Sequence, residues 1–215
     1  MYLLHDYFRS SAAYRVRIAL NYKQLPYQLH QIHLVKNGGE QHSQEYKKLN
    51  PQGRVPTLQQ GDLTLTQSLA ILEYLEETHP EPAILPTEPL KRAKARSLAY
   101  IIACDVHPLN NLAVLQYLKK ELAVSDQAKQ DWYAHWIIEG FNAIEAELKH
   151  CAGQYCVGDQ ISIADICLAP QMYNARRFQV DLSGFPKICS IYDQCMKHDA
   201  FVQADPDVQP GAKAQ

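Results

Sequence analysis

Four prolines within ten residues divide this chain of 215 residues into two parts with different sequence patterns. Proline cannot continue a helix, and several prolines close together stiffen an extended connection. Before these prolines, short stretches in which apolar and polar residues alternate, as in strands, are mixed with stretches of helical spacing. After them, apolar residues recur only at helical spacing. The sequence therefore predicts two domains, residues 1–80 and 90–210, joined by a linker over residues 81–89. The four residues are Pro80, Pro82, Pro86 and Pro89.

The first part has the order βαβ, a connecting helix, and then ββα. Three helices are predicted in this part. The first follows the cap candidates Ser10 and Ser11, and the second lies between Gly38-Gly39 and about Leu49. The third begins at Ser68, which is expected to be its N-cap. The turn cluster Asn50–Gly53 precedes the last two strands, which form a hairpin. The predicted strands are Tyr2–Leu4, Tyr27–Ile32, a segment from Val55 to Leu58, and Leu63–Thr66.

The second part is predicted to be entirely helical. Ser162 and Asp165 have the spacing of a capping box, and Ile161 before them can pack on Ile166 as a hydrophobic staple. This signal favours an architectural role for Asp165, the clean start of a core helix. Apolar residues recur at helical spacing over Lys91–His107, Leu109–Leu122, Ala134–Leu148 and Ser162–Tyr173.

Composition excludes several classes of function. The 21 basic and 23 acidic residues give a net charge of −2, which provides no basic face for a nucleic acid. The longest apolar run, Leu98–Cys104, is too short to cross a membrane, and no secretory leader is recognisable. The six cysteines form no CxxC pair and the nine histidines are scattered, so we expect a reducing, cytoplasmic compartment and no metal.

Six motifs follow one another along the chain: Ser10–Leu20, Asn50-Pro51, Val55–Leu58, Gln67–Ile71, His107–Leu112 and Tyr155–Asp159. In this order they resemble the cytosolic glutathione transferases, from Tyr2 to about Pro206. The segment Ser10–Leu20 is similar to the signature of the zeta class, whose members include maleylacetoacetate isomerase. This resemblance implies an α+β two-domain fold, in which a thioredoxin-like domain is followed by an all-α domain. It also implies glutathione as the cofactor and a homodimer as the assembly.

The resemblance implies glutathione-dependent isomerisation of maleylacetoacetate to fumarylacetoacetate, a step of tyrosine and phenylalanine catabolism. The thiolate adds to the cis double bond, the bond rotates, and the thiolate leaves. The zeta pattern often reads Ser-Ser-Cys-Ser where this chain has Ser10-Ser11-Ala12-Ala13, so glutathione must supply the only thiol in this loop. Two alternatives remain: a transferase that conjugates or dehalogenates small α-halo acids, and a binding module without chemistry, against which the retained motifs argue.

The resemblance also assigns roles to individual residues. Ser10 is predicted to donate a hydrogen bond to the thiolate, with Ser11 as the second candidate, although both serines could be only N-caps. Arg177, just before Phe178, and Arg9 are candidates for the two carboxylates of a dicarboxylic substrate, or else surface arginines. The implied cofactor contacts are Arg15, Gln41, the Val55 backbone before a cis Pro56, Gln67, Ser68, His107 (or else a core histidine) and Asn111.

Overall fold

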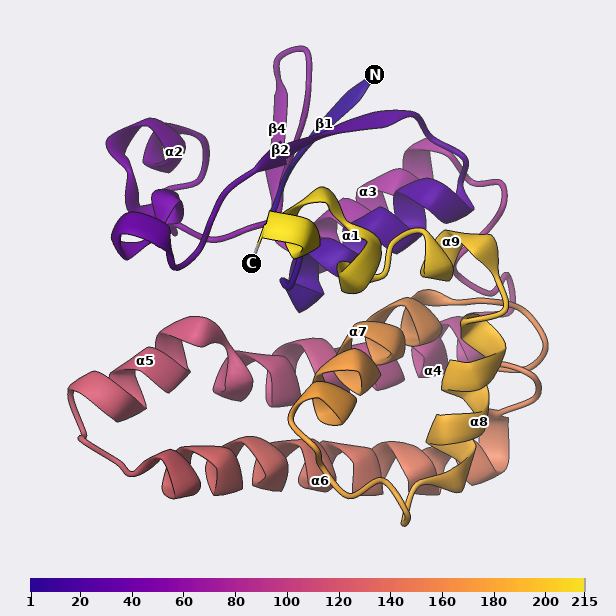
Figure 1. Ribbon diagram of the computed structural model, residues 1–215. Coiled ribbons are helices and arrows are strands. Elements are labelled where there is room, and N and C mark those ends of the chain that lie inside the picture. Colours follow the sequence, from indigo (N-terminus) through magenta and orange to yellow (C-terminus); the bar gives the residue numbers. More distant parts are fainter. Residues whose placement is uncertain (215) are drawn as a thin grey trace. The chain divides into compact units, whose positions relative to one another are not determined.

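The computed structural model describes residues 1–214, which form two compact units (Figure 1). The first unit contains Met1–Ile84 together with the residues from Lys197 onward, and the second contains Leu85–Met196. The division after Ile84 falls inside the predicted linker. The residues from Lys197 onward pack with the first unit, whereas the sequence prediction places residues 90–210 in the helical domain.

The first unit contains a four-stranded sheet with the order β2-β1-β3-β4. Strand β1 runs parallel to β2 and antiparallel to β3, and β3 and β4 form a hairpin in which Leu58 lies opposite Leu65. The sheet is therefore mixed, as the βαβ and ββα order predicts, although β3 begins two residues later than expected. The strands are β1 Tyr2–Asp6, β2 Tyr27–Gln31, β3 Thr57–Gln60 and β4 Leu63–Thr66.

Helices pack on both faces of this sheet. Successive side chains along β1 point to opposite faces, so neighbouring residues contact different helices. Asp6 bonds to Arg17 of α1, whereas the neighbouring His5 ring lies 5.8 Å from the Tyr46 ring of α2. Helix α3 packs against α1. The helical segments of this unit are α1 Ser11–Tyr22, η1 Lys36–Gly38, η2 Glu40–His42, α2 Gln44–Leu49, α3 Ser68–Thr78, α9 Asp199–Val202, η5 Pro206–Val208 and η6 Pro210–Ala214.

The caps of α1 and α3 differ from each other. Ser10 is the N-cap of α1, as predicted, and its Oγ accepts a hydrogen bond from the Ala13 backbone N–H at 3.2 Å. Ser68 was expected to cap α3, but it is the first helical residue. The N-cap is Gln67, whose side chain makes no capping bond and whose φ is +68°. A positive φ is unfavourable for a residue with a Cβ atom, so the tertiary structure holds this turn in place.

The named elements of the second unit are all helices and are built around α7, and an isolated bridge joins Ala152 to Gly158. Twelve of the 15 residues of α7 are buried, and the helix packs against α4 and α8. Its capping box is present as predicted: the backbone N–H and the hydroxyl of Ser162 both donate to Asp165 Oδ2 at 2.8 Å. The elements are α4 Pro89–Tyr100, η3 Ile101–Val106, η4 His107–Asn110, α5 Leu112–Lys120, α6 Asp126–Cys151, α7 Ile163–Arg177 and α8 Pro186–Cys195.

One run of helical segments, residues 89–120, is long and apolar enough to cross a membrane when judged by length and composition alone. The longest uninterrupted apolar run, Leu98–Cys104, is only a small part of this stretch, because polar residues are interspersed along the rest of it. The run is not one helix. It widens to a π-helix over Ile101–Val106, tightens to a 3₁₀-helix, and breaks at Asn111, where the backbone is extended (ψ 160°).

Candidate active site

Ser10 stands at the start of α1 with its hydroxyl oriented by the helix. Its Oγ accepts the bond from Ala13 N–H, so the hydroxyl hydrogen remains available to a second partner. The first turn of α1 contains no acidic residue, and the positive end of the helix dipole is therefore not neutralised. Ser10 is half-buried, whereas Ser11 is only 5% exposed. The geometry favours Ser10 over Ser11 as the hydroxyl that a ligand reaches.

The turn before β3 packs beside this serine loop. Val55–Pro56 is a cis peptide bond, as expected. The side chains of Tyr46 and Asn50 both donate to the Arg54 carbonyl oxygen at 2.7 Å, which leaves the Val55 backbone outside this set of bonds. The Val55 side chain belongs to one apolar cluster with Tyr7, Phe8, Ile32 and Tyr46.

The start of α3 lies next to both of these segments. The Gln67 amide donates to Gln52 Oε1 at 2.6 Å, which joins the helix to the turn that precedes Val55. Arg15 Nη1 donates to Ser68 Oγ at 3.2 Å, which joins it to α1. Arg15 and Ser68 are both buried, so a guanidinium charge lies beside the free N–H groups of a helix N-terminus. Both features attract a carboxylate.

Gln41 provides an acceptor that is available to a ligand. Its Nε2 donates to the Leu34 carbonyl oxygen at 3.2 Å, while its Oε1 is buried and has no hydrogen-bond partner among residues 1–214. Gly39 makes room for this side chain, since a Cβ atom there would overlap the Gln41 amide. A buried acceptor without a partner is costly, and a peptide N–H would satisfy it. The site therefore fits a peptide-like cofactor with a free carboxylate.

These contacts bring most of the predicted residues of the first unit together, from the serine loop to the start of α3. Arg9 is half-buried, and its guanidinium carbon lies 4.8 Å from the Phe8 ring centroid. Two residues that hold the Val55 turn in place, Gln52 and Tyr46, are not among the residues predicted from the sequence. The turn cluster Asn50–Gly53 was the available signal for Gln52.

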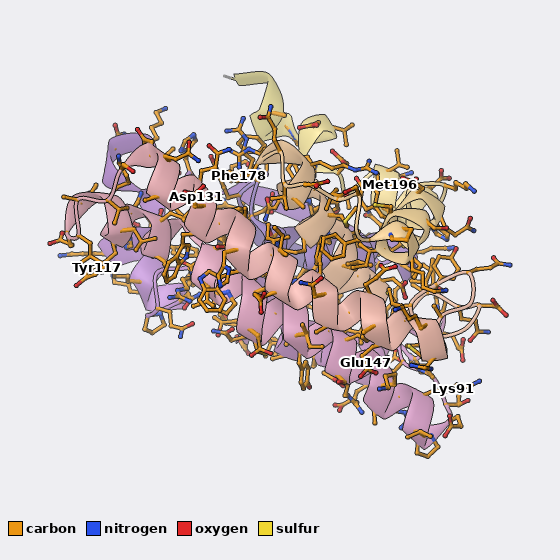
Figure 2. All side chains as sticks on the ribbon, turned by 90° about the horizontal axis from the view of Figure 1, so that it is seen from below. Lys91, Tyr117, Asp131, Glu147, Phe178 and Met196 are labelled. Atoms are coloured by element: carbon orange, nitrogen blue, oxygen red, sulfur yellow. The ribbon has the colours of Figure 1, made fainter. Side chains whose placement is uncertain are left out.

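The predicted residues of the second unit gather at one end of it. Arg177 is exposed at the end of α7, 5.0 Å from the centroid of the Phe178 ring. Phe178, labelled in Figure 2, stacks on Tyr133 with 3.8 Å between ring centroids, and burial raises the pKa of Tyr133. The Asn110 amide donates to the Tyr133 carbonyl oxygen at 3.1 Å, so the segment beginning at His107 lies beside the end of α7.

Asn111 has a structural task in this segment. Its Oδ1 accepts from the Val114 N–H at 3.1 Å, and its Nδ2 donates to the Pro108 carbonyl oxygen at 2.7 Å. Both ends of the amide therefore have partners inside the unit, which favours an N-cap of α5 over a cofactor contact. Among the described residues, no group of three or more His, Cys, Asp or Glu side chains is arranged to hold a metal ion.

Comparisons with known proteins agree with this arrangement. Residues 4–83 match the glutathione S-transferase N-terminal domain, and residues 136–199 match the C-terminal domain. A probable maleylacetoacetate isomerase of Vibrio cholerae is 50% identical over 98% of this chain and 98% of that protein.

Two solved structures are similar over nearly the whole chain. One is the holo structure of maleylpyruvate isomerase, a bacterial glutathione S-transferase of the zeta class. It has a TM-score of 0.94 and 43% identity and covers 97% of this chain and 98% of that one.

The other is a maleylacetoacetate isomerase of Methylobacterium extorquens AM1 with bound malonate and glutathione. It has a TM-score of 0.94 and 39% identity and covers 98% of this chain and 99% of that one. The chain thus belongs to the glutathione S-transferase family and, within it, to the zeta class that contains the maleylacetoacetate isomerases.

Proposed function

We propose that this protein is a maleylacetoacetate isomerase that binds glutathione and converts a cis double bond of a small dicarboxylic acid into a trans one. When bound, glutathione supplies the sulfur nucleophile that adds to the double bond and leaves again, so it is required but not consumed. The observation that carries the proposal is the oriented Ser10 hydroxyl at the uncompensated N-terminus of α1, in a loop whose Ala12 offers no thiol.

The start of α1 can stabilise a thiolate by enough to lower the pKa of the glutathione thiol toward neutral pH. A free thiol has a pKa of about 8.5, and lowering it by about 2 units takes about 2.7 kcal/mol of preference for the thiolate. A helix N-terminus contributes up to about 2 kcal/mol in a partly buried site, and a hydrogen bond to a charged group about 1.5–3 kcal/mol. The Ser10 hydroxyl and the helix terminus together meet this requirement.

The other residues of the first unit hold the cofactor in place. The Val55 backbone pairs with the cysteinyl peptide as an added strand, and Gln41 accepts from its glycine end. Arg15, Gln67 and Ser68 bind the γ-glutamyl carboxylate at the start of α3, where the helix end and the guanidinium both favour a negative charge.

Arginines bind the carboxylates of the substrate in this proposal. Arg177 is exposed, and its guanidinium lies against the Phe178 ring, which leaves its N–H groups free to form a bidentate pair with a carboxylate. Arg9, beside the serine loop, is the candidate of the first unit for a substrate carboxylate. Arginines of this kind favour acids over neutral electrophiles as substrates.

An isomerase assay with substoichiometric glutathione tests the proposed reaction. We expect maleylacetoacetate to be converted in many turnovers per glutathione molecule, with the total glutathione unchanged, and no conversion without it. Calorimetric titration should give one glutathione site per chain. Consumption of one glutathione per product, or faster release of halide from an α-halo acid, would favour the transferase alternative. The absence of binding heat at millimolar glutathione would remove the proposal.

We also propose that the protein is a cytoplasmic homodimer. An apolar 18-residue window within residues 89–120 is only 28% buried, and apolar residues that one chain leaves uncovered favour a protein interface. The two-fold dimer is the commonest closed assembly, and six cysteines without disulfides suit a reducing compartment.

Sedimentation at micromolar concentration tests the dimer. We expect a mass of about twice the 24.5 kDa of one chain. A mass of 24.5 kDa at every concentration would contradict it.

A further inference from the structure

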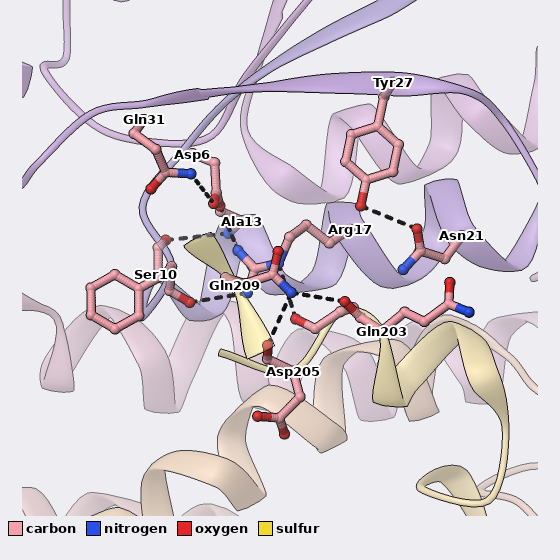
Figure 3. A network of polar contacts seen from close by, with 12 residues as sticks. Asp6, Ser10, Ala13, Arg17, Asn21, Tyr27, Gln31, Gln203, Asp205 and Gln209 are labelled. Atoms are coloured by element: carbon pink, nitrogen blue, oxygen red, sulfur yellow. Dashed lines mark hydrogen bonds and ion pairs between the residues drawn. The ribbon is translucent and has the colours of Figure 1, made fainter. Parts of the chain in front are cut away.

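A buried arginine joins the serine loop to the C-terminal segment of the first unit, residues 203–212, which we call the strap (Figure 3). Arg17 is 0% exposed, and each of its guanidinium nitrogens has its own partner. Nη1 pairs with Asp6 Oδ1 at 2.5 Å, Nη2 donates to the Phe8 carbonyl oxygen at 3.0 Å, and Nε donates to the Ala204 carbonyl oxygen at 3.0 Å. One side chain thus connects β1, the loop before Ser10 and the strap.

The strap has a fixed shape of its own. Gln209 is 4% exposed, and its Nε2 donates to the carbonyl oxygens of Gln203 and Asp205, at 2.8 and 3.0 Å. Asp205 Oδ1 accepts from the Asp207 N–H at 2.9 Å. These bonds close residues 203–209 into a compact turn.

The end of the strap contacts the same loop a second time. A Cβ atom on Gly211 would come within 2.9 Å of the buried Phe8 ring, and Ala212 packs on the cluster that contains Phe8 and Val55. The Ser10 N–H donates to the Tyr7 carbonyl oxygen at 2.8 Å, so the backbone from Tyr7 to Ser10 is one tight turn. The strap therefore contacts the ring of Phe8, and Arg17 bonds to its carbonyl.

We propose that Arg17 and the strap are positioning elements, which hold the Tyr7–Ser10 turn where the Ser10 hydroxyl can stabilise the glutathione thiolate. This inference rests on the role given to Ser10 in the proposed function. Arg17 is fully buried behind the loop, and the strap packs on the apolar cluster that includes the Val55 side chain. A lysine at position 17 could keep the pair with Asp6, but as a point charge it cannot serve three acceptors in a fixed fork.

The full-length Gly211→Val variant tests this proposal by pressing the strap against the Phe8 ring. The pKa of the bound glutathione thiol, followed by thiolate absorbance, should rise by about 0.5–1 unit, and kcat at pH 7 should fall about 3- to 10-fold. Activity should recover toward pH 9. The KM for glutathione should change less than about twofold, because the atoms nearest to a Cβ at position 211 belong to Phe8 and Gln31, not to Gln41 or the start of α3. Arg17→Lys should shift the thiol pKa in the same direction.

Gly184→Val is the matched control, because a Cβ atom there meets nothing within 4 Å, and it should leave every readout unchanged. A thiol titration of Gly211→Val that matches the unmodified protein would overturn the proposal, and so would an activity loss equal at pH 7 and pH 9. If Arg17→Lys does not fold, the Gly211→Val result decides. If Ser10→Ala leaves the pKa of the bound thiol unchanged, the role given to Ser10 in the proposed function is wrong. If Ser10→Ala shifts this pKa but Gly211→Val and Arg17→Lys do not, only the proposal about Arg17 and the strap is wrong.

Discussion

Replacing Ser10 by alanine is expected to raise the pKa of the bound glutathione thiol by about one to two units, each unit corresponding to about 1.4 kcal/mol. The hydroxyl that donates to the thiolate is removed, and only the helix terminus remains to stabilise the charge. The thiol is then mostly protonated at pH 7, and the isomerase rate there should fall about 10- to 100-fold. The rate should recover partly at pH 9, because the thiolate re-forms above its raised pKa. An absorbance titration of the bound thiol and a pH–rate profile measure both effects.

Two control variants separate this effect from the loss of a helix cap. Ser125 caps α6 as Ser10 caps α1, with its Oγ accepting from the Ala128 N–H at 3.1 Å. Ser125→Ala should therefore lose a similar amount of folding stability, about 1 kcal/mol, without moving the thiol pKa. Ser11→Ala should move it less than Ser10→Ala, because Ser11 is buried. If only Ser11→Ala shifts the thiol pKa, then Ser11 and not Ser10 donates to the thiolate. If neither variant shifts it, both serines are only helix caps.

Replacing Arg177 by alanine is expected to cost on the order of 2–4 kcal/mol in kcat/KM, because a charged, hydrogen-bonded pair with a substrate carboxylate is lost. Glutathione affinity should hardly change, since the cofactor residues of the first unit are intact. Steady-state kinetics with saturating glutathione and a separate calorimetric titration measure the two quantities.

The neighbouring arginine offers a matched control. Arg176 is also exposed, pairs with Asp193 at 3.1 Å, and lies 4.3 Å from the Tyr192 ring centroid. Arg176→Ala removes a surface ion pair worth about 0–1 kcal/mol and the contact with the Tyr192 ring, and turnover should stay close to that of the unmodified protein. Equal activity losses in both variants would mean that the end of α7 is disturbed as a whole, and normal turnover in Arg177→Ala would make Arg177 a surface residue.

The sequence alone determined the features whose signals lie within a few neighbouring residues. Strand alternation and helical spacing located the sheet and four helical stretches, and the Ser10 and Ser162 caps have the predicted bonds. Helix α8 was not predicted, although Pro186 at its first position and the apolar spacing from Ile188 to Cys195 are helix signals. These features follow from local sterics and from the period of a helix or strand.

The tertiary structure alone decided features that depend on partners distant in sequence. Arg17 and Ala204 are 187 positions apart, and nothing in the local pattern of α1 indicates that its arginines are buried. Contacts between residues distant in sequence also assign the residues from Lys197 onward to the first unit. The positive φ of Gln67 makes this residue, and not the predicted Ser68, the N-cap of α3. The side chain of Gln67 bonds to Gln52, 15 positions away. A buried charge or a strained backbone is stable only where the surrounding fold supplies its partners.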